Sequence, residues 1–135
     1  MKIDGGCYCG YITYEAEAEL DKARICHCTD CQTMTGSAFR TVLIVPGATF
    51  KLLSGQPTIF IKTADSGNKR EQGFCPKCGT PLFSRMPDGA PGPYVLRLGS
   101  VRQRNQFVPQ SQIWNRSRQA WLKDLESVPK VEMQG

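Results

Sequence analysis

Alternating apolar and polar positions predict a β-strand close to the N-terminus. Residues 11–18 read YITYEAEA, and the apolar side chains Ile12, Tyr14, Ala16 and Ala18 fall on one side. The threonine and glutamates between them fall on the other side, because successive side chains of a strand point to opposite faces. This pattern is typical of a strand that buries one face and exposes the other.

Short apolar runs separated by glycine and proline continue along most of the chain. Residues 39–45 read FRTVLIV and end at a turn signal, Pro46 followed by Gly47. Residues 86–93 read MPDGAPGP, which predicts a loop. Further strands are predicted at residues 49–53, 58–63, 69–74, 80–85 and 94–98. Many short strands with frequent turns favour a mainly β fold.

Helix signals are few. Thr29 followed by Gln32 matches a capping box, and Gly36 lies where such a helix would end. A second candidate begins at Ser117 and ends before Pro129, with three apolar side chains on the way: Trp121, Leu122 and Leu125. We therefore expect little helix.

Composition indicates an ordinary globular chain. With 135 residues, 40% hydrophobic and 21% charged, we expect one domain over residues 1–135. The net charge is +5, but the basic residues are scattered, so nucleic acid is not expected as the main ligand. No apolar run approaches the ~20 residues of a membrane span. The opening MKIDGGCYCG lacks the apolar segment of a secretory signal, so we expect a cytoplasmic location, where thiols stay reduced.

Seven cysteines form three clusters along the chain. The pair Cys75 and Cys78 lies in CPKCG, a strong zinc signal because the short spacer lets a tight turn aim both sulfurs inward. Two sulfurs on one zinc lie ~3.7 Å apart, given Zn–S bonds near ~2.3 Å. Alternate residues of a flat strand lie ~6.5–7 Å apart. The chain must therefore bend at the pair Cys7 and Cys9, which glycines flank.

Four-coordinate structural zinc takes two ligands from each of these pairs. Cys7, Cys9, Cys75 and Cys78 together complete a closed site that fastens the N-terminus to the middle of the chain. We interpret these four residues as a structural zinc site that holds the fold and does no chemistry.

Cys26, Cys28 and Cys31 remain, within six residues of sequence. Three protein ligands and one exchangeable position are typical of a catalytic zinc site. If the helix begins at Thr29, Cys31 lies in its first turn, where the helix dipole favours a thiolate. The alternatives are a second structural zinc with a distant fourth ligand, a redox pair with a spectator thiol, and a metal-free cluster. We expect His27 to point away from the metal and make a local contact instead.

Other candidate residues carry weaker signals. We expect Trp114 and Trp121 to lie in the core. A substrate carboxylate is a candidate ligand for four basic side chains, although exposed basic residues usually meet only water: Arg40, Lys69, Arg70 and Arg97. The sequence identifies no general acid or base.

The three cysteine motifs together carry a family resemblance. GGCYCG, CHCTDCQTMTGSAF and FCPKCGTPLF, in this order and spacing, resemble the glutathione-dependent formaldehyde-activating enzyme family, which includes centromere protein V. The resemblance covers roughly residues 5–129. It implies a β-tent of small antiparallel sheets stitched by zinc. It also implies a structural zinc at Cys7, Cys9, Cys75 and Cys78 and a catalytic zinc at Cys26, Cys28 and Cys31. The activity it implies is addition of glutathione to formaldehyde, as in carbon–sulfur lyases.

These observations together predict a zinc-dependent carbon–sulfur lyase or synthase that acts on an adduct of glutathione or another thiol. Two zinc ions per chain are expected, with the three-cysteine site partly empty. The sequence does not fix the oligomeric state, and a homo-oligomer is one of the possibilities. The first alternative is a non-catalytic zinc module that binds protein or nucleic acid. The second is a thiol-based metal or redox sensor.

Overall fold

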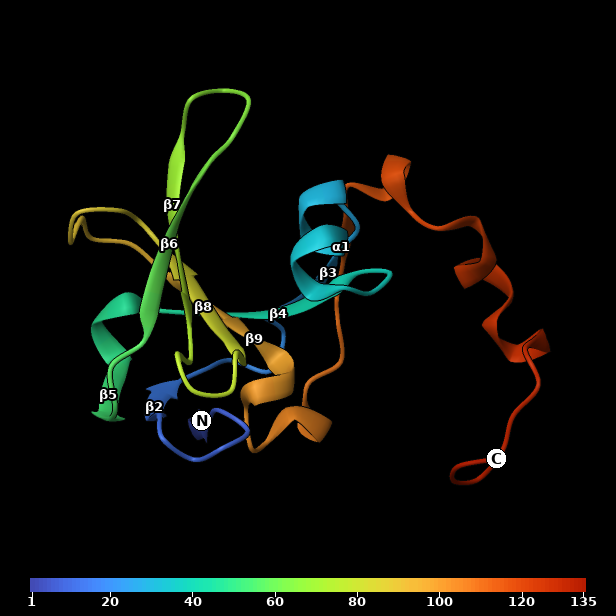
Figure 1. Cartoon of the computed structure of the whole chain (residues 1–135), viewed down its shortest axis with the longest axis horizontal. Coiled ribbons are helices and arrows are strands. Elements are labelled where there is room, and N and C mark those ends of the chain that lie inside the picture. The colour runs from blue at the N-terminus through green and yellow to red at the C-terminus, as the bar shows by residue number, and fades with distance from the viewer.

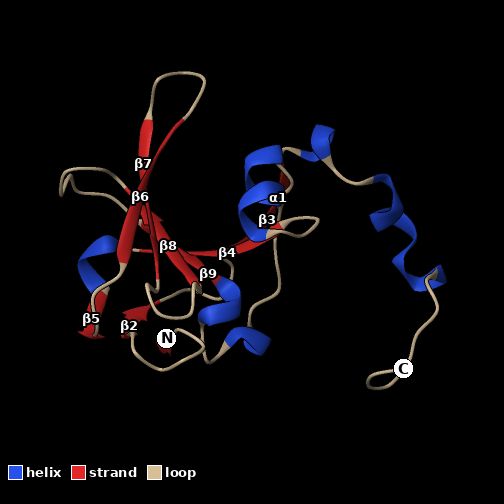
Figure 2. Ribbon diagram, viewed as in Figure 1, coloured by secondary structure: helices blue, strands red, loops and turns tan.

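The computed structural model describes residues 1–135, and its strands form two sheets (Figures 1 and 2). The smaller sheet contains β1 (Lys2–Gly6), β2 (Thr13–Glu17) and β5 (Lys51–Ser54), in the spatial order β1–β2–β5. The larger sheet contains seven strands: β3 (Ala23–Cys26), β4 (Arg40–Val45), β6 (Thr58–Thr63), β7 (Lys69–Phe74), β8 (Pro81–Arg85), β9 (Tyr94–Arg97) and β10 (Gln112–Ile113). Their spatial order is β10–β3–β4–β9–β8–β7–β6. The prediction of a mainly β fold is confirmed.

All strand pairings are antiparallel except that of β10 with β3, which is parallel. The alternation of residues 11–18 places Tyr14 and Ala16 in the core as predicted. The strands predicted at residues 58–63 and 69–74 match β6 and β7 at both ends. Three strands were not predicted, β1, β3 and β10, because they are glycine-rich or very short and form by pairing with distant strands.

The one α-helix, α1 (Thr29–Thr35), begins and ends where the sequence predicted, but its N-cap is Cys28 and not Thr29. The Sγ of Cys28 accepts the backbone N–H of Cys31 at 3.2 Å. Gln32 does not complete a capping box, because its Nε2 donates to the carbonyls of His27 and Ser117 at 2.8 and 3.0 Å. Gly36 ends the helix in the left-handed conformation, with φ of 65°.

The remaining helical elements are 3₁₀ turns: η1 (Gly47–Thr49), η2 (Leu98–Ser100), η3 (Arg104–Gln106), η4 (Asn115–Ser117) and η5 (Ala120–Ser127). The second predicted helix is therefore wrong, since η5 is interrupted by the non-helical backbone of Asp124. Trp114 and Trp121 are 57% and 52% exposed, so their expected place in the core is also wrong. Figure 1 shows that the C-terminal segment runs past α1 and away from both sheets. None of the helices is both long and apolar enough to cross a membrane.

The core lies between the two sheets and includes two of the cysteines. Phe50 joins the layers, with its ring 5.3 Å from that of Tyr14 on β2 and 5.5 Å from that of Phe83 on β8. Phe83 lies opposite Gly73 of β7, and a Cβ at residue 73 would overlap its ring. Cys7 and Cys75 belong to the same buried cluster. The core therefore reaches the predicted four-cysteine site.

The larger sheet has two different faces. Leu43 and Val45 of β4 and Leu96 of β9 lie in the core, on one face. The alternate residues Arg40, Val42 and Ile44 of β4, and Val95 and Arg97 of β9, line a pocket instead. Because side chains alternate along a strand, this pocket lies over the face that the core does not use.

Candidate metal centres and adjoining pocket

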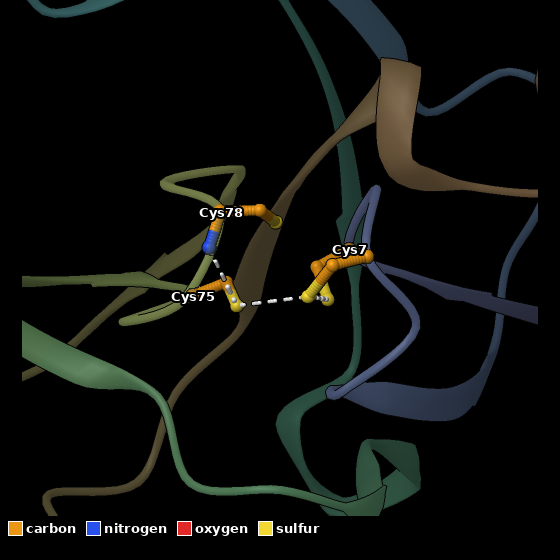
Figure 3. Close-up of side chains that lie close together, drawn as sticks. Cys7, Cys75 and Cys78 are labelled. Atoms are coloured by element: carbon orange, nitrogen blue, oxygen red, sulfur yellow. Dashed lines mark hydrogen bonds between the residues drawn. The ribbon is translucent and has the colours of Figure 1, made fainter.

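The four cysteines of the predicted closed site lie together, with all four sulfurs within 4.8 Å of one another. The Sγ of Cys9 is 3.6 Å from that of Cys7 and 3.8 Å from that of Cys75. Figure 3 shows Cys7 on one loop facing Cys75 and Cys78 on the other. These separations match the ~3.7 Å edge of a tetrahedral zinc–sulfur site. The donor set, all sulfur, also suits zinc.

Backbone N–H groups point at these sulfurs. Ile12 donates to the Sγ of Cys7 at 3.2 Å, and Lys77 and Cys78 donate to the Sγ of Cys75 at 3.3 and 3.4 Å. A hydrogen bond from the Thr80 hydroxyl lowers the pKa of the Cys78 thiol to about 5. Hydrogen bonds of this kind stabilise thiolates, the form that binds metal.

The four-cysteine cluster joins the β1–β2 connection to the β7–β8 connection. Tyr8 extends this contact, since its backbone N–H donates to the Thr80 hydroxyl at 3.0 Å. Cys7 and Cys75 are buried, whereas Cys9 and Cys78 are exposed. One side of the cluster therefore faces the core and the other faces solvent.

The remaining three cysteines form a second cluster, with their sulfurs within 4.8 Å of one another. Cys26 ends β3, Cys28 caps α1 and Cys31 lies in the first turn of α1. A hydrogen bond from Cys26 and the neighbouring Arg40 lower the pKa of Cys31 to about 5, while the contact with Cys31 and burial raise the pKa of Cys26. Three sulfur donors without a fourth protein ligand suit a zinc site with one open position.

His27 lies between two of these cysteines in sequence but is not part of the cluster. Its ring is buried, pairs with Gln112 through Nε2 at 2.7 Å, and packs 5.7 Å from the ring of Phe39. The predicted local contact of His27 is confirmed. Gln112 belongs to β10, so this contact helps to hold the C-terminal part of the chain against β3.

A pocket of about 440 Å³ adjoins the three-cysteine cluster. Alternate residues of neighbouring strands form its floor, and Asp30, Cys31 and Met34 of α1 line its side. Two cross-strand rows can be traced on the floor. The first is Arg24, Val42 and Arg97; the second is Gln72, Ser84, Val95 and Ile44. Trp114 also lines the pocket, whereas from the sequence we expected it in the core.

The predicted basic candidates divide between the pocket and the surface. Arg40, Arg70 and Arg97 line the pocket, and Arg40 is only 5% exposed, so Arg40 is not the exposed basic residue that usually meets only water. Lys69 is exposed and lies outside the pocket. Sequence reasoning missed Arg24 and Lys62. A signal existed for Arg24 alone, since it lies two positions before Cys26 on β3 and alternate residues of a strand share a face.

Burial affects the charge of these arginines. Desolvation, helped by repulsion from Arg40, lowers the pKa of Arg97 to about 9, and desolvation also lowers the pKa of Arg70. Arg97 donates to the Gln72 Oε1, and Arg70 donates to the Ser84 Oγ at 3.3 Å. Both partners are neutral, so these contacts do not compensate the positive charges.

Comparisons with known proteins give a family and a fold for this chain. A family model described as glutathione-dependent formaldehyde-activating enzyme matches residues 2–117. A crystal structure of a Rhodobacter sphaeroides protein is similar to this chain with a TM-score of 0.61. The two are 17% identical, and the similarity covers 81% of this chain and 98% of that one. At this identity the likeness concerns the fold alone.

Proposed function

This chain belongs to the glutathione-dependent formaldehyde-activating enzyme family, and we propose on that basis that it is a zinc-dependent carbon–sulfur lyase or synthase. Its substrate would be an adduct of glutathione or of another thiol with a small aldehyde. The observation that carries the proposal is the three-cysteine cluster, which has no fourth protein ligand and adjoins a pocket.

In this proposal Cys26, Cys28 and Cys31 hold a zinc ion. A zinc ion there supplies Lewis acidity that keeps a substrate thiol deprotonated near neutral pH. In the synthase direction, the thiolate sulfur of the substrate adds to the aldehyde carbon, a C–S bond forms, and the carbonyl oxygen takes up a proton. In the lyase direction the adduct hydroxyl gives up its proton, the C=O bond re-forms as the C–S bond breaks, and the sulfur leaves as a thiolate.

The protein's own residues position the substrate. A substrate bound over the sheet floor and beside α1 would have its sulfur and its carbonyl carbon held together in one pocket, which lowers the entropic cost of bringing the two atoms together. The Arg40 side chain lies beside Cys31, where its positive charge favours the thiolate form of the cluster. The four-cysteine cluster is assigned a structural zinc, because it is saturated by protein sulfurs.

Zinc stoichiometry tests the proposal most directly. We expect two zinc ions per chain in the wild type and one in Cys28→Ser, with the fold retained, when metal content is measured by mass spectrometry after desalting. We also expect glutathione to change the zinc exchange rate of the wild type and not of Cys28→Ser. Consumption of formaldehyde in the presence of glutathione should be lost in Cys28→Ser. Two tightly held zinc ions indifferent to thiols, with Cys28→Ser unfolded, would contradict the enzyme and favour a non-catalytic zinc module.

A further inference from the structure

The pocket beside the three-cysteine cluster is strongly basic. Five cationic side chains line it: Arg24, Arg40, Lys62, Arg70 and Arg97. The one carboxylate among its lining residues, Asp30, is already paired with Lys62 at 2.9 Å. The arginines come from β3, β4, β7 and β9, strands that are adjacent or nearly so in the larger sheet.

These arginines lack the partners that other arginines of this protein have. Arg85 bonds to the carboxylate of Glu71 at 2.8 Å, and Arg102 bonds to that of Asp4 at 2.9 Å. By contrast, the buried Nε atoms of Arg24, Arg40 and Arg97 have no hydrogen-bond partner. A buried cation without a counter-ion is destabilising, so its persistence needs a reason.

The cysteine cluster compensates only part of this charge. Three thiolates around a divalent cation carry one net negative charge, and Asp30 carries another. Against five cationic side chains, three positive charges remain uncompensated. An anionic ligand in the pocket would supply the missing negative charge.

We propose that Arg40, Arg70 and Arg97 form a carboxylate-binding site, so that the substrate is a thiol, or its aldehyde adduct, that carries a carboxylate. The inference rests on the proposed function for the thiol half of the ligand. Guanidinium groups pair with carboxylates through two parallel hydrogen bonds, which orients the ligand as well as holding it. Val42, Ile44 and Val95 provide an apolar wall beside the arginines, suited to a short aliphatic spacer.

The same charge balance fixes an orientation for glutathione. The pocket has no free carboxylate to receive an ammonium group. Glutathione would therefore direct its glycine carboxylate to the arginines and keep its γ-glutamyl ammonium group outside the pocket. Its sulfur would then lie between the two ends, toward the cysteines.

Titration calorimetry on the zinc-loaded protein tests the site with three probes. The first probe, 3-mercaptopropionate, has both a thiol and a carboxylate. The second, propionate, lacks the thiol. The third, 2-mercaptoethanol, lacks the carboxylate. We expect 3-mercaptopropionate to bind most tightly and propionate to compete with it. Arg70→Gln and Arg97→Gln should each weaken 3-mercaptopropionate about tenfold or more and leave 2-mercaptoethanol unchanged. The matched control is Lys69→Gln, an exposed neighbour of Arg70, which should bind all three probes as the wild type does.

The probes separate failure of this inference from failure of the proposed function. Equal binding of 3-mercaptopropionate and 2-mercaptoethanol, unaffected by either arginine substitution, would overturn the carboxylate site and leave the thiol chemistry in place. Binding of propionate that equals that of 3-mercaptopropionate, and is weakened by Arg97→Gln, would support the carboxylate site and contradict the thiol role of the cysteines. Displacement by inorganic phosphate at concentrations where propionate has no effect would overturn the assignment to a carboxylate. If Arg97→Gln does not fold, the carboxylate site is judged from Arg70→Gln, since Arg70 is less buried than Arg97.

Discussion

At the scale of single residues, Arg97 illustrates how binding and stability conflict. Its guanidinium is buried, its Nε has no partner, and its one side-chain partner is the neutral Gln72. In the ligand-free protein the neighbouring Cys26 and Cys31 offset only part of the cost of desolvating this charge. Arg97 therefore lies where an apolar residue would stabilise the fold better.

We expect Arg97→Met to increase the free energy of unfolding of the ligand-free, zinc-loaded protein by about 1 kcal/mol or more, and so to raise its thermal unfolding midpoint. The reason is that the substitution keeps most of the side-chain volume and removes an uncompensated charge. Arg102→Met is the matched control, because Arg102 is exposed and paired with Asp4, and it should lower the midpoint slightly or leave it unchanged. Circular dichroism melts measure both. A clear fall in the midpoint of Arg97→Met would mean that the guanidinium serves the fold.

The metal-ligand candidates were within reach of the sequence, but the arginine floor was not. Short spacers, as in CPKCG and CHCTDC, bring cysteines together whatever the rest of the chain does. The floor arises from β3, β4, β7, β8 and β9, and their spatial order depends on pairings between distant residues. The sequence could suggest that Arg40 shares a face with Val42. It could not place Arg97 across from Val42.

At the scale of elements, a chain of polar contacts links three strands at one end of the larger sheet. Glu71 of β7 accepts from the Nε of Arg85 of β8 at 2.8 Å, and Arg85 donates onward to the hydroxyl of Tyr94 of β9 at 3.0 Å. Glu71 also accepts the backbone N–H of Asp88 at 3.2 Å, which fixes the β8–β9 loop. These contacts, Arg85 first, hold the pKa of Glu71 below its ordinary value.

This network predicts an acid-sensitive contribution to stability. A carboxylate with a lowered pKa stabilises the folded protein at pH values above its ordinary pKa of 4.5, and the contribution is lost as the pH falls below that value. We expect Glu71→Gln to lower stability at pH 7 by about 1 kcal/mol. The difference from wild type should shrink as the pH falls from 5 toward ~3. Urea unfolding across this range measures it, with the exposed Glu19→Gln as control. A difference that is independent of pH would exclude ionisation of Glu71 as its source.

Strands with clear alternation were predictable as elements, and those defined by their neighbours were not. Residues 58–63 and 69–74 have the composition and turn boundaries of a hairpin, and both strands form as predicted. The two-residue β10 exists only because Gln112 and Ile113 lie beside β3, where Gln112 meets His27. The predicted C-terminal helix failed because no apolar surface packs against Trp121 and Leu125, which stay exposed.

At the scale of the whole molecule, the two cysteine clusters hold different parts of the structure. The four-cysteine cluster joins the small sheet to the large one at the edge of the core. The three-cysteine cluster joins β3 to the helix that follows it, which is a local connection. Loss of the first should therefore affect the fold, and loss of the second should affect the pocket.

We expect Cys75→Ser to lower the unfolding midpoint by more than about 10 °C, since a structural zinc contributes folding free energy directly. Cys28→Ser, the matched substitution in the other cluster, should change the midpoint by far less. Chelator added to the wild type should reproduce the Cys75→Ser melting curve once the closed site is emptied. Differential scanning calorimetry compares the three. Equal destabilisation by both substitutions would contradict the division into one structural and one open site.

The sequence positions of the four-cysteine cluster also have a consequence during synthesis of the chain on the ribosome. Cys7 and Cys9 leave the ribosome first, and Cys75 and Cys78 follow about 70 residues later. At translation rates of roughly 5–20 residues per second, the first pair waits about 4–14 seconds for the second. During that interval two N-terminal thiols have no final partner, and the small sheet cannot be fastened to the large one. Nascent chains of this protein are therefore most exposed to oxidation and to stray metal until Cys75 and Cys78 have been added.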